Sequence, residues 1–225
     1  MDVQNDAGAR ELLIQQFGVK RVPIVAKGGK FVFAHILETI AEFIGQQGTG
    51  QVRLPPAELF NKWMYILRAA RRYVMQMPNE QLHERATANR VRTVRLLEHH
   101  VFNIVDSHIE CLATGAKSLS DLTNREDIGD MYSSAGEMAG YGGEAIARIE
   151  KWWDELADKS LQGLSPATDY GPGFSLHQML ELSVWHSTQH TRQIAAVLER
   201  LGIEPDRKLT AEDLAGLPLP DRIWE

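Results

Sequence analysis

Four long stretches of helical periodicity constrain the fold of this chain more than any other feature of its sequence. Apolar residues recur in them every three to four positions, a spacing that places side chains on one face of an α-helix. The stretches cover residues 56–77, 90–114, 129–157 and 174–202. Four amphipathic helices of this length, joined by loops, are typical of a four-helix bundle. The sequence therefore predicts a mainly α protein.

Residues with special backbone preferences mark the ends and weak points of these helices. Pro55 and Pro56 suit the first turn of the first helix. Ser175 is a suitable N-cap for the last helix, and Gly202 is a suitable stop. The glycine-rich stretch 140–144 is expected to kink or weaken the third helix. The proline-punctuated tail after residue 204 is expected to pack across the bundle.

The first 45 residues follow a different pattern, which predicts a small α/β segment. A helix is expected at 7–17, two strands around a turn at Gly28 and Gly29, and a second helix at 36–45. A Gly- and Gln-rich stretch follows and ends in the proline pair. We therefore predict three parts: an α/β segment at 1–47, a linker at 48–56, and the helical domain with its tail at 57–225.

Composition and sequence patterns disfavour several classes of protein. The 225 residues carry a formal net charge of −6 and show no basic stripe, which disfavours nucleic-acid binding. No apolar run is long enough to span a membrane, and the first residues do not resemble a signal peptide. Cys111 is the single cysteine, so no internal disulfide can form. These features predict a cytoplasmic protein.

Two histidines interrupt the apolar face of the last helix. The face consists of Met179, Ser183, His186, His190, Ile194, Val197 and Leu201. Two histidines four residues apart lie one turn from each other, so their rings can converge on one metal ion. A buried neutral imidazole otherwise needs partners for both of its nitrogens. The pair His186 and His190 is therefore a candidate for metal ligation, the alternative being two hydrogen-bonded core histidines.

The second long helix supplies a third histidine. Its apolar stripe is Val94, Leu97, Val101, Ile104 and Val105. Adjacent residues on a helix are about 100° apart, so His99 and His100 cannot both face the stripe. The angle favours His100 at the edge of the core and predicts that His99 faces solvent. His108 also projects inward and is a weaker candidate for a fourth ligand or a supporting group.

Three imidazoles would leave coordination positions open, which is typical of a catalytic metal site rather than a structural one. Imidazole binds several divalent metals, of which we favour zinc or nickel. Gln189 and Arg192 flank the histidine pair and are candidates for substrate binding. Arg192 would bind a carboxylate, unless it is an ordinary solvated arginine. Tyr141 lies in the glycine-rich stretch and could line a cleft or simply pack.

Residues 56–202 resemble the DinB-like superfamily of metal-binding four-helix bundles. The resemblance is carried by "RTVRLLEHHVFNI" in the second helix and "VWHSTQHTRQIAAVLERLGI" in the last. It implies a divalent metal held by His100 together with the His-x-x-x-His pair, His186 and His190. Members of this superfamily include enzymes that use mycothiol or bacillithiol for transfer or isomerisation. The resemblance therefore implies a thiol cosubstrate activated by the metal.

The N-terminal segment is similar to the C-terminal part of a thioredoxin-like domain of the glutaredoxin type. The matching stretch is "FGVKRVPIVAKGGKFVFAHILETIAEFIG", in which Pro23 falls where such folds carry a cis-proline beside the thiol site. Pro23 is therefore a candidate for thiol binding. The segment lacks a Cys-x-x-Cys motif, so redox catalysis is not predicted, and a structural appendage is the alternative. An incomplete sheet with a free edge favours a homodimer.

These observations lead to one main functional hypothesis and one from another class. The first is a metal-dependent enzyme that transfers a low-molecular-weight thiol to a small electrophile, in detoxification or a related isomerisation. The second is a non-enzymatic stress protein that binds a metal or a small ligand. Hydrolysis by a metal-activated water is less favoured, because the sequence offers no evident general base.

Overall fold

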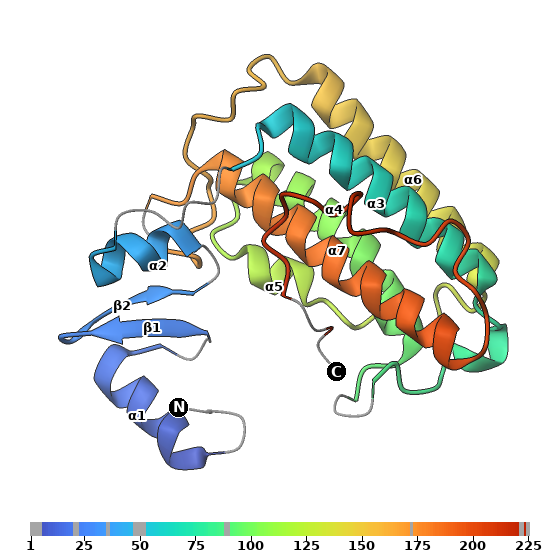
Figure 1. Ribbon diagram of the computed structural model, residues 1–225, viewed down its shortest axis with the longest axis horizontal. Helices are drawn as coiled ribbons and strands as arrows, with labels where there is room; N and C mark the ends of the chain where they lie inside the picture. The colour runs from blue at the N-terminus through green and yellow to red at the C-terminus, as the bar shows by residue number, and fades with distance from the viewer. Residues whose placement is uncertain are drawn as a thin grey trace. The chain divides into compact units, whose positions relative to one another are not determined.

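A computed structural model of the protein describes residues 6–19, 23–34, 37–46, 53–87, 91–171, 173–220 and 223 (Figure 1). The chain divides into two compact units between residues 52 and 53, and residues 170–172 group with the first unit. The sequence expects a linker at 48–56, of which residues 48–52 lie outside the described part. The architecture is mainly α with a small two-stranded sheet, as the periodicity predicts.

The first unit contains the predicted α-β-β-α order. Its elements are α1 (Ala7–Phe17), β1 (Ile24–Lys27), β2 (Lys30–Phe33) and α2 (Leu37–Ile44). The strands are antiparallel and pair Lys27 with Lys30, so the connection is the two glycines between them. Gly28 and Gly29 have φ angles of 59° and 75°. A two-residue hairpin with both central residues at positive φ favours glycine at each position.

Local signals explain the boundaries of α1. The carboxylate of Asp6 accepts hydrogen bonds from the backbone N–H groups of Gly8 and Ala9 and caps the start of the helix. The predicted stop, Gly18, adopts a left-handed φ of 67°. The predicted first strand and second helix also involve Val22 and Ile36, which lie outside the described residues.

Four long helices form the second unit and pack as a bundle (Figure 1). They are α3 (Pro56–Gln76), α4 (Val94–Thr114), α6 (Ala135–Glu155) and α7 (Leu176–Arg200), with short helices η1 (Asn79–Gln81) and α5 (Leu119–Thr123) in the connections. Both α3 and α4 pack against α6 and against α7. Each of these two helices therefore buries two faces, which matters for the histidines of α4.

Capping side chains mark where α4, α6 and α7 begin. Thr93 accepts a hydrogen bond from the backbone of Leu96, so α4 begins at Val94 rather than at residue 90. Ser134 caps α6 in the same way, so that helix begins six residues later than the periodicity predicts. The predicted cap of α7 is confirmed, because Ser175 forms a reciprocal capping box with Gln178.

Helix α6 continues through its glycines without interruption. This differs from the expectation of a kink. A Cβ atom on Gly142 would lie 2.5 Å from the ring of Phe102, so the glycine permits close packing of α6 on α4. Gly140 is exposed and has no such neighbour.

The C-terminal tail lies across the bundle, as predicted. Leu217 is buried, and Leu209, Leu214 and Leu219 pack against the core of the bundle. The Lys62 ammonium on α3 donates to the Asp213 carbonyl at 2.9 Å. Among the helices of the described residues, none combines the length and the apolar character needed to cross a membrane.

Candidate metal centre

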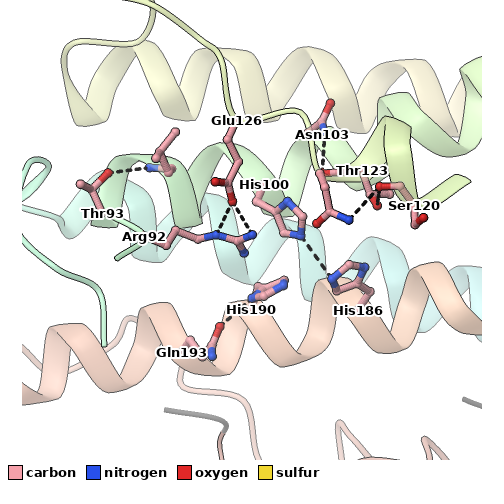
Figure 2. A network of polar contacts seen from close by, with 12 residues as sticks. Arg92, Thr93, His100, Asn103, Ser120, Thr123, Glu126, His186, His190 and Gln193 are labelled. Carbon is pink, nitrogen blue, oxygen red and sulfur yellow. Dashed lines mark hydrogen bonds and ion pairs between the residues drawn. The ribbon is translucent and has the colours of Figure 1, made fainter. Parts of the chain in front are cut away.

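The structure brings three of the predicted histidines together between α4 and α7. His100 projects from α4, and His186 and His190 project from α7 (Figure 2). One ring nitrogen from each residue lies within 4.8 Å of the other two. The Nε2 atoms of His100 and His186 are 3.2 Å apart. His100 and His190 are buried, and His186 is partly exposed. These three residues could hold a metal ion.

The arrangement follows from the geometry of the two helices. His186 and His190 are one turn apart, and their ring centroids lie 4.9 Å from each other. The His100 ring faces the pair edge-on, with its centroid 4.9 Å from that of His186 and 4.7 Å from that of His190. One ring nitrogen from each of the three imidazoles is therefore presented to a common region.

The electrostatics favour a neutral imidazole at His100. Burial lowers the pKa of His100 well below its ordinary value, and the two neighbouring imidazoles add to the effect. A neutral ring keeps one lone pair free to bind a metal. His100 Nδ1 is buried and has no hydrogen-bond partner among the described residues. The donor set and the neutral state of His100 fit a divalent metal that prefers nitrogen ligands.

Gln193 fixes the tautomer of one candidate ligand. Its Oε1 atom lies 2.6 Å from Nδ1 of His190 (Figure 2). Because an amide oxygen only accepts, Nδ1 carries the proton and the Nε2 lone pair remains available. Metal-binding histidines are commonly oriented by such a second hydrogen bond. Sequence reasoning missed Gln193, although its position three residues after His190 is a usable signal.

His99 is buried, so the prediction that it faces solvent was wrong. Only 7% of the residue is exposed. Its ring stacks on Tyr141, with centroids 5.4 Å apart, and lies 5.9 Å from that of Tyr132. The prediction assumed that α4 buries one face, whereas α4 packs against both α6 and α7. Two adjacent histidines can therefore both be buried, and only His100 belongs to the cluster.

Tyr141 packs in the interface between α4 and α6. Its hydroxyl donates to Oδ2 of Asp106 at 2.7 Å. Arg148 binds the same carboxylate through two nitrogens, at 2.8 and 3.0 Å. Burial, followed by the charge of Asp106, raises the pKa of Tyr141. These contacts give Tyr141 a packing role beside His99, and its part in substrate binding stays a prediction.

His108 lies outside the cluster and is a buried, hydrogen-bonded residue of the core. Its Nδ1 atom is 2.9 Å from the hydroxyl oxygen of Ser183, and that hydroxyl donates to the Met179 carbonyl. Nδ1–H is therefore the donor to Ser183. The rings of Trp63 and Trp152 pack around the imidazole. Burial lowers the pKa of His108 to about 3.

The remaining predicted site residues lie in two places. Arg192 donates to the amide oxygen of Gln189 at 2.8 Å and to the carbonyl of Pro220 at 3.0 Å. Its guanidinium is therefore tied to the tail rather than fully solvated. Pro23 belongs to the first unit, where it is exposed and its carbonyl accepts a hydrogen bond from the backbone of Ala34.

Two further buried polar groups near the middle of α4 were not predicted. The side-chain amide of Asn103 donates to the carbonyls of Leu122 and Thr123, which joins α5 to α4 (Figure 2). Glu98 is fully buried, and neither carboxylate oxygen has a hydrogen-bond partner in the part of the chain that the structure describes. Burial raises the pKa of Glu98 well above its ordinary value. Glu98 is two residues from His100 and projects from the opposite side of the helix.

Comparisons with protein-family models, with curated proteins and with solved structures find no match for this chain. The DinB-like and thioredoxin-like resemblances therefore remain predictions from the quoted residues.

Proposed function

We propose that this protein is a metal-dependent enzyme of the DinB-like type, which transfers a low-molecular-weight thiol to a small electrophile. The observation that carries the proposal is the convergence of three imidazoles from α4 and α7, with ring nitrogens within 4.8 Å of one another. His100, His186 and His190 would hold the divalent ion, with zinc or nickel favoured. Three protein ligands leave room for a small molecule at the ion.

A divalent ion bound there would supply Lewis acidity and lower the pKa of a coordinated thiol or water. The residues of the chain supply the remainder of the site. The Gln193 oxygen occupies Nδ1 of His190 and so would leave the Nε2 lone pair of that ring available to the ion. The low pKa of His100 keeps that ring unprotonated near neutral pH, so it remains a ligand.

The nucleophilic sulfur would come from a cosubstrate and not from the chain. Cys111 is the one cysteine, and its thiol is buried and donates to the Ala116 carbonyl at 3.3 Å. Burial raises the pKa of this thiol, which disfavours the reactive thiolate. In the proposed reaction the external thiol loses its proton to solvent and its sulfur bonds to the electrophile. The leaving group departs with the electron pair of the broken bond.

The proposal includes an assembly and a location. We propose a homodimer, because the described sheet of the first unit has only two strands and so leaves backbone groups open to pairing. We propose a cytoplasmic protein, because a buried free cysteine suits a reducing compartment. Pro23, in the first unit, is proposed to bind a thiol, by its resemblance to the proline of thioredoxin-like folds.

Metal analysis tests the site first. Purified wild-type protein is expected to bind about one divalent ion per chain, as a single mononuclear site would. Combined His186→Ala and His190→Ala substitutions should abolish binding, because one imidazole remains. His83→Ala is the matched control, since His83 is exposed and outside the cluster. Unchanged metal content in the double variant would contradict the proposed ligands.

Thiol titration of the cobalt-substituted protein then separates the enzyme from the alternative, a non-enzymatic metal- or ligand-binding stress protein. A thiol that binds at the open position should change the visible spectrum of the cobalt ion. Turnover of an electrophile with that thiol would support the transferase. Metal binding without any spectral response to thiols would favour the non-enzymatic protein.

A further inference from the structure

Gln189 carries a buried hydrogen-bond donor that has no partner among the residues that the structure describes. The residue lies on α7 between the two candidate ligands of that helix and is 3% exposed. Its Oε1 atom accepts a hydrogen bond from Arg192 at 2.8 Å. Because a guanidinium only donates, this contact determines which end of the amide is the oxygen. The amide nitrogen is therefore the other end, and it is buried without a hydrogen-bond partner.

The C-terminal tail holds this arrangement in place. The same Nη1 atom of Arg192 donates to the carbonyl of Pro220 at 3.0 Å. The tail thus restrains the guanidinium, and the guanidinium restrains the amide of Gln189. Arg192 is on this basis a positioning residue, and Gln189 is the group that remains free to bind. A buried donor without an acceptor is costly, so an acceptor supplied by a ligand would be stabilising.

We propose that the Gln189 amide nitrogen binds the carboxylate of a small molecule held at the three-histidine cluster, an inference that rests on the proposed metal site. Gln189 follows His186 by three residues, which places their Cβ atoms about 5–6 Å apart on one side of the helix. A ligand held at the histidines would need to extend along this side of the helix by less than one turn to meet the amide. The adjacent guanidinium adds positive charge and polarises the amide, which favours an anionic acceptor over a neutral one.

The test compares two thiols that differ in one group. Cobalt-loaded wild-type protein is titrated with 3-mercaptopropionate and with propanethiol, and each dissociation constant is taken from the change in the cobalt spectrum. The carboxylate-bearing thiol is expected to bind about tenfold more tightly or better, the gain typical of a hydrogen bond to a charged group. Equal affinities in the wild type would overturn the proposal.

Substitutions assign the preference to Gln189. Gln189→Met keeps the shape of the side chain and removes the donor, so it should bind both thiols with the wild-type propanethiol affinity. Cobalt affinity should not change, because Gln189 is not a ligand. Arg192→Met should weaken the preference partially, through loss of orientation. Gln15→Met, an exposed substitution in α1, is the matched control and should behave as wild type. A full preference retained in Gln189→Met would refute the role of Gln189.

A second substitution at Gln189 keeps the test usable if the first variant does not fold. If Gln189→Met does not fold, Gln189→Glu replaces the donor by a carboxylate that pairs with Arg192, and it should make 3-mercaptopropionate the weaker ligand. A preference retained in Gln189→Glu would also count against the proposal. Failure of the metal site is distinguishable, because wild-type protein would then give no cobalt spectrum with either thiol.

Discussion

At the scale of single residues, His108 shows that the core of the bundle holds a histidine in its neutral form. His108 is almost completely buried among tryptophans and a serine, where a positive charge would lack solvation. Its pKa is lowered to about 3 for that reason, so the folded protein keeps this imidazole neutral over most of the acid range. The ring donates one hydrogen bond to Ser183, which identifies it as a core histidine and not a fourth ligand.

The depressed pKa of His108 predicts acid sensitivity with a definite sign. Below about pH 6.5, His108 becomes protonated in the unfolded chain but stays neutral in the folded protein. The free energy of unfolding therefore falls as the pH decreases toward 3. The slope from one such group is at most about 1.4 kcal/mol per pH unit. His108→Asn, which retains a donor for Ser183, should remove that slope.

Urea unfolding at several pH values between 7 and 4 measures the effect. The difference in the free energy of unfolding between His108→Asn and the wild type should shift in favour of the variant as the pH falls. His83→Asn is the control, since an exposed histidine should leave the slope unchanged. Parallel stability curves for wild type and His108→Asn would show that His108 titrates normally.

At the scale of the elements, packing of α6 on α4 depends on one glycine. Gly142 lies against the ring of Phe102, which is fully buried and cannot move toward solvent. The helix accepts the poor intrinsic propensity of glycine at this position because the absence of a Cβ allows the close approach. Gly140, two residues earlier and exposed, offers no such compensation.

Two alanine substitutions should therefore have opposite effects. Gly142→Ala is expected to destabilise the protein by about 1–3 kcal/mol, because the new methyl group overpacks the core. Gly140→Ala should stabilise it by up to about 1 kcal/mol, through helix propensity alone. Thermal and urea unfolding of both variants measures the difference. Equal effects of the two substitutions would mean that the contact with Phe102 does not limit the packing.

At the scale of the whole molecule, the proposed metal would join α4 to α7 and so stabilise the fold. A ligand that binds only the folded state at a hundred times its dissociation constant adds about 2.7 kcal/mol. For a protein of this size, that gain raises the unfolding temperature by about 5–10 °C. Scanning calorimetry with saturating zinc or nickel, and again after a chelator, measures the shift. The combined His186→Ala and His190→Ala variant should show none, and the His83→Ala control should show the full shift.

Much of the architecture could be predicted because its signals are local. The apolar spacing of the long helices and the cap at Ser175 depend on neighbouring residues only. Likewise, the spacing of His186 and His190 predicts their convergence. The burial of His99 could not be predicted from the single apolar stripe of α4, because it depends on packing of α4 against both α6 and α7. The hydrogen bond from Arg192 on α7 to Pro220 in the tail could not be predicted either, because only the folded tail brings these two segments together. The same nitrogen of Arg192 also donates to Gln189.

The distance along the chain between the two histidine-bearing helices has a consequence for biosynthesis. His100 and His186 are 86 residues apart in sequence, yet their Nε2 atoms are 3.2 Å apart in the folded protein. A growing polypeptide that has not yet reached α7 offers one of the three imidazoles. If these residues hold the proposed ion, its capture by all three would follow translation of the last helix, so the complete site could not form while only the earlier helices have been made.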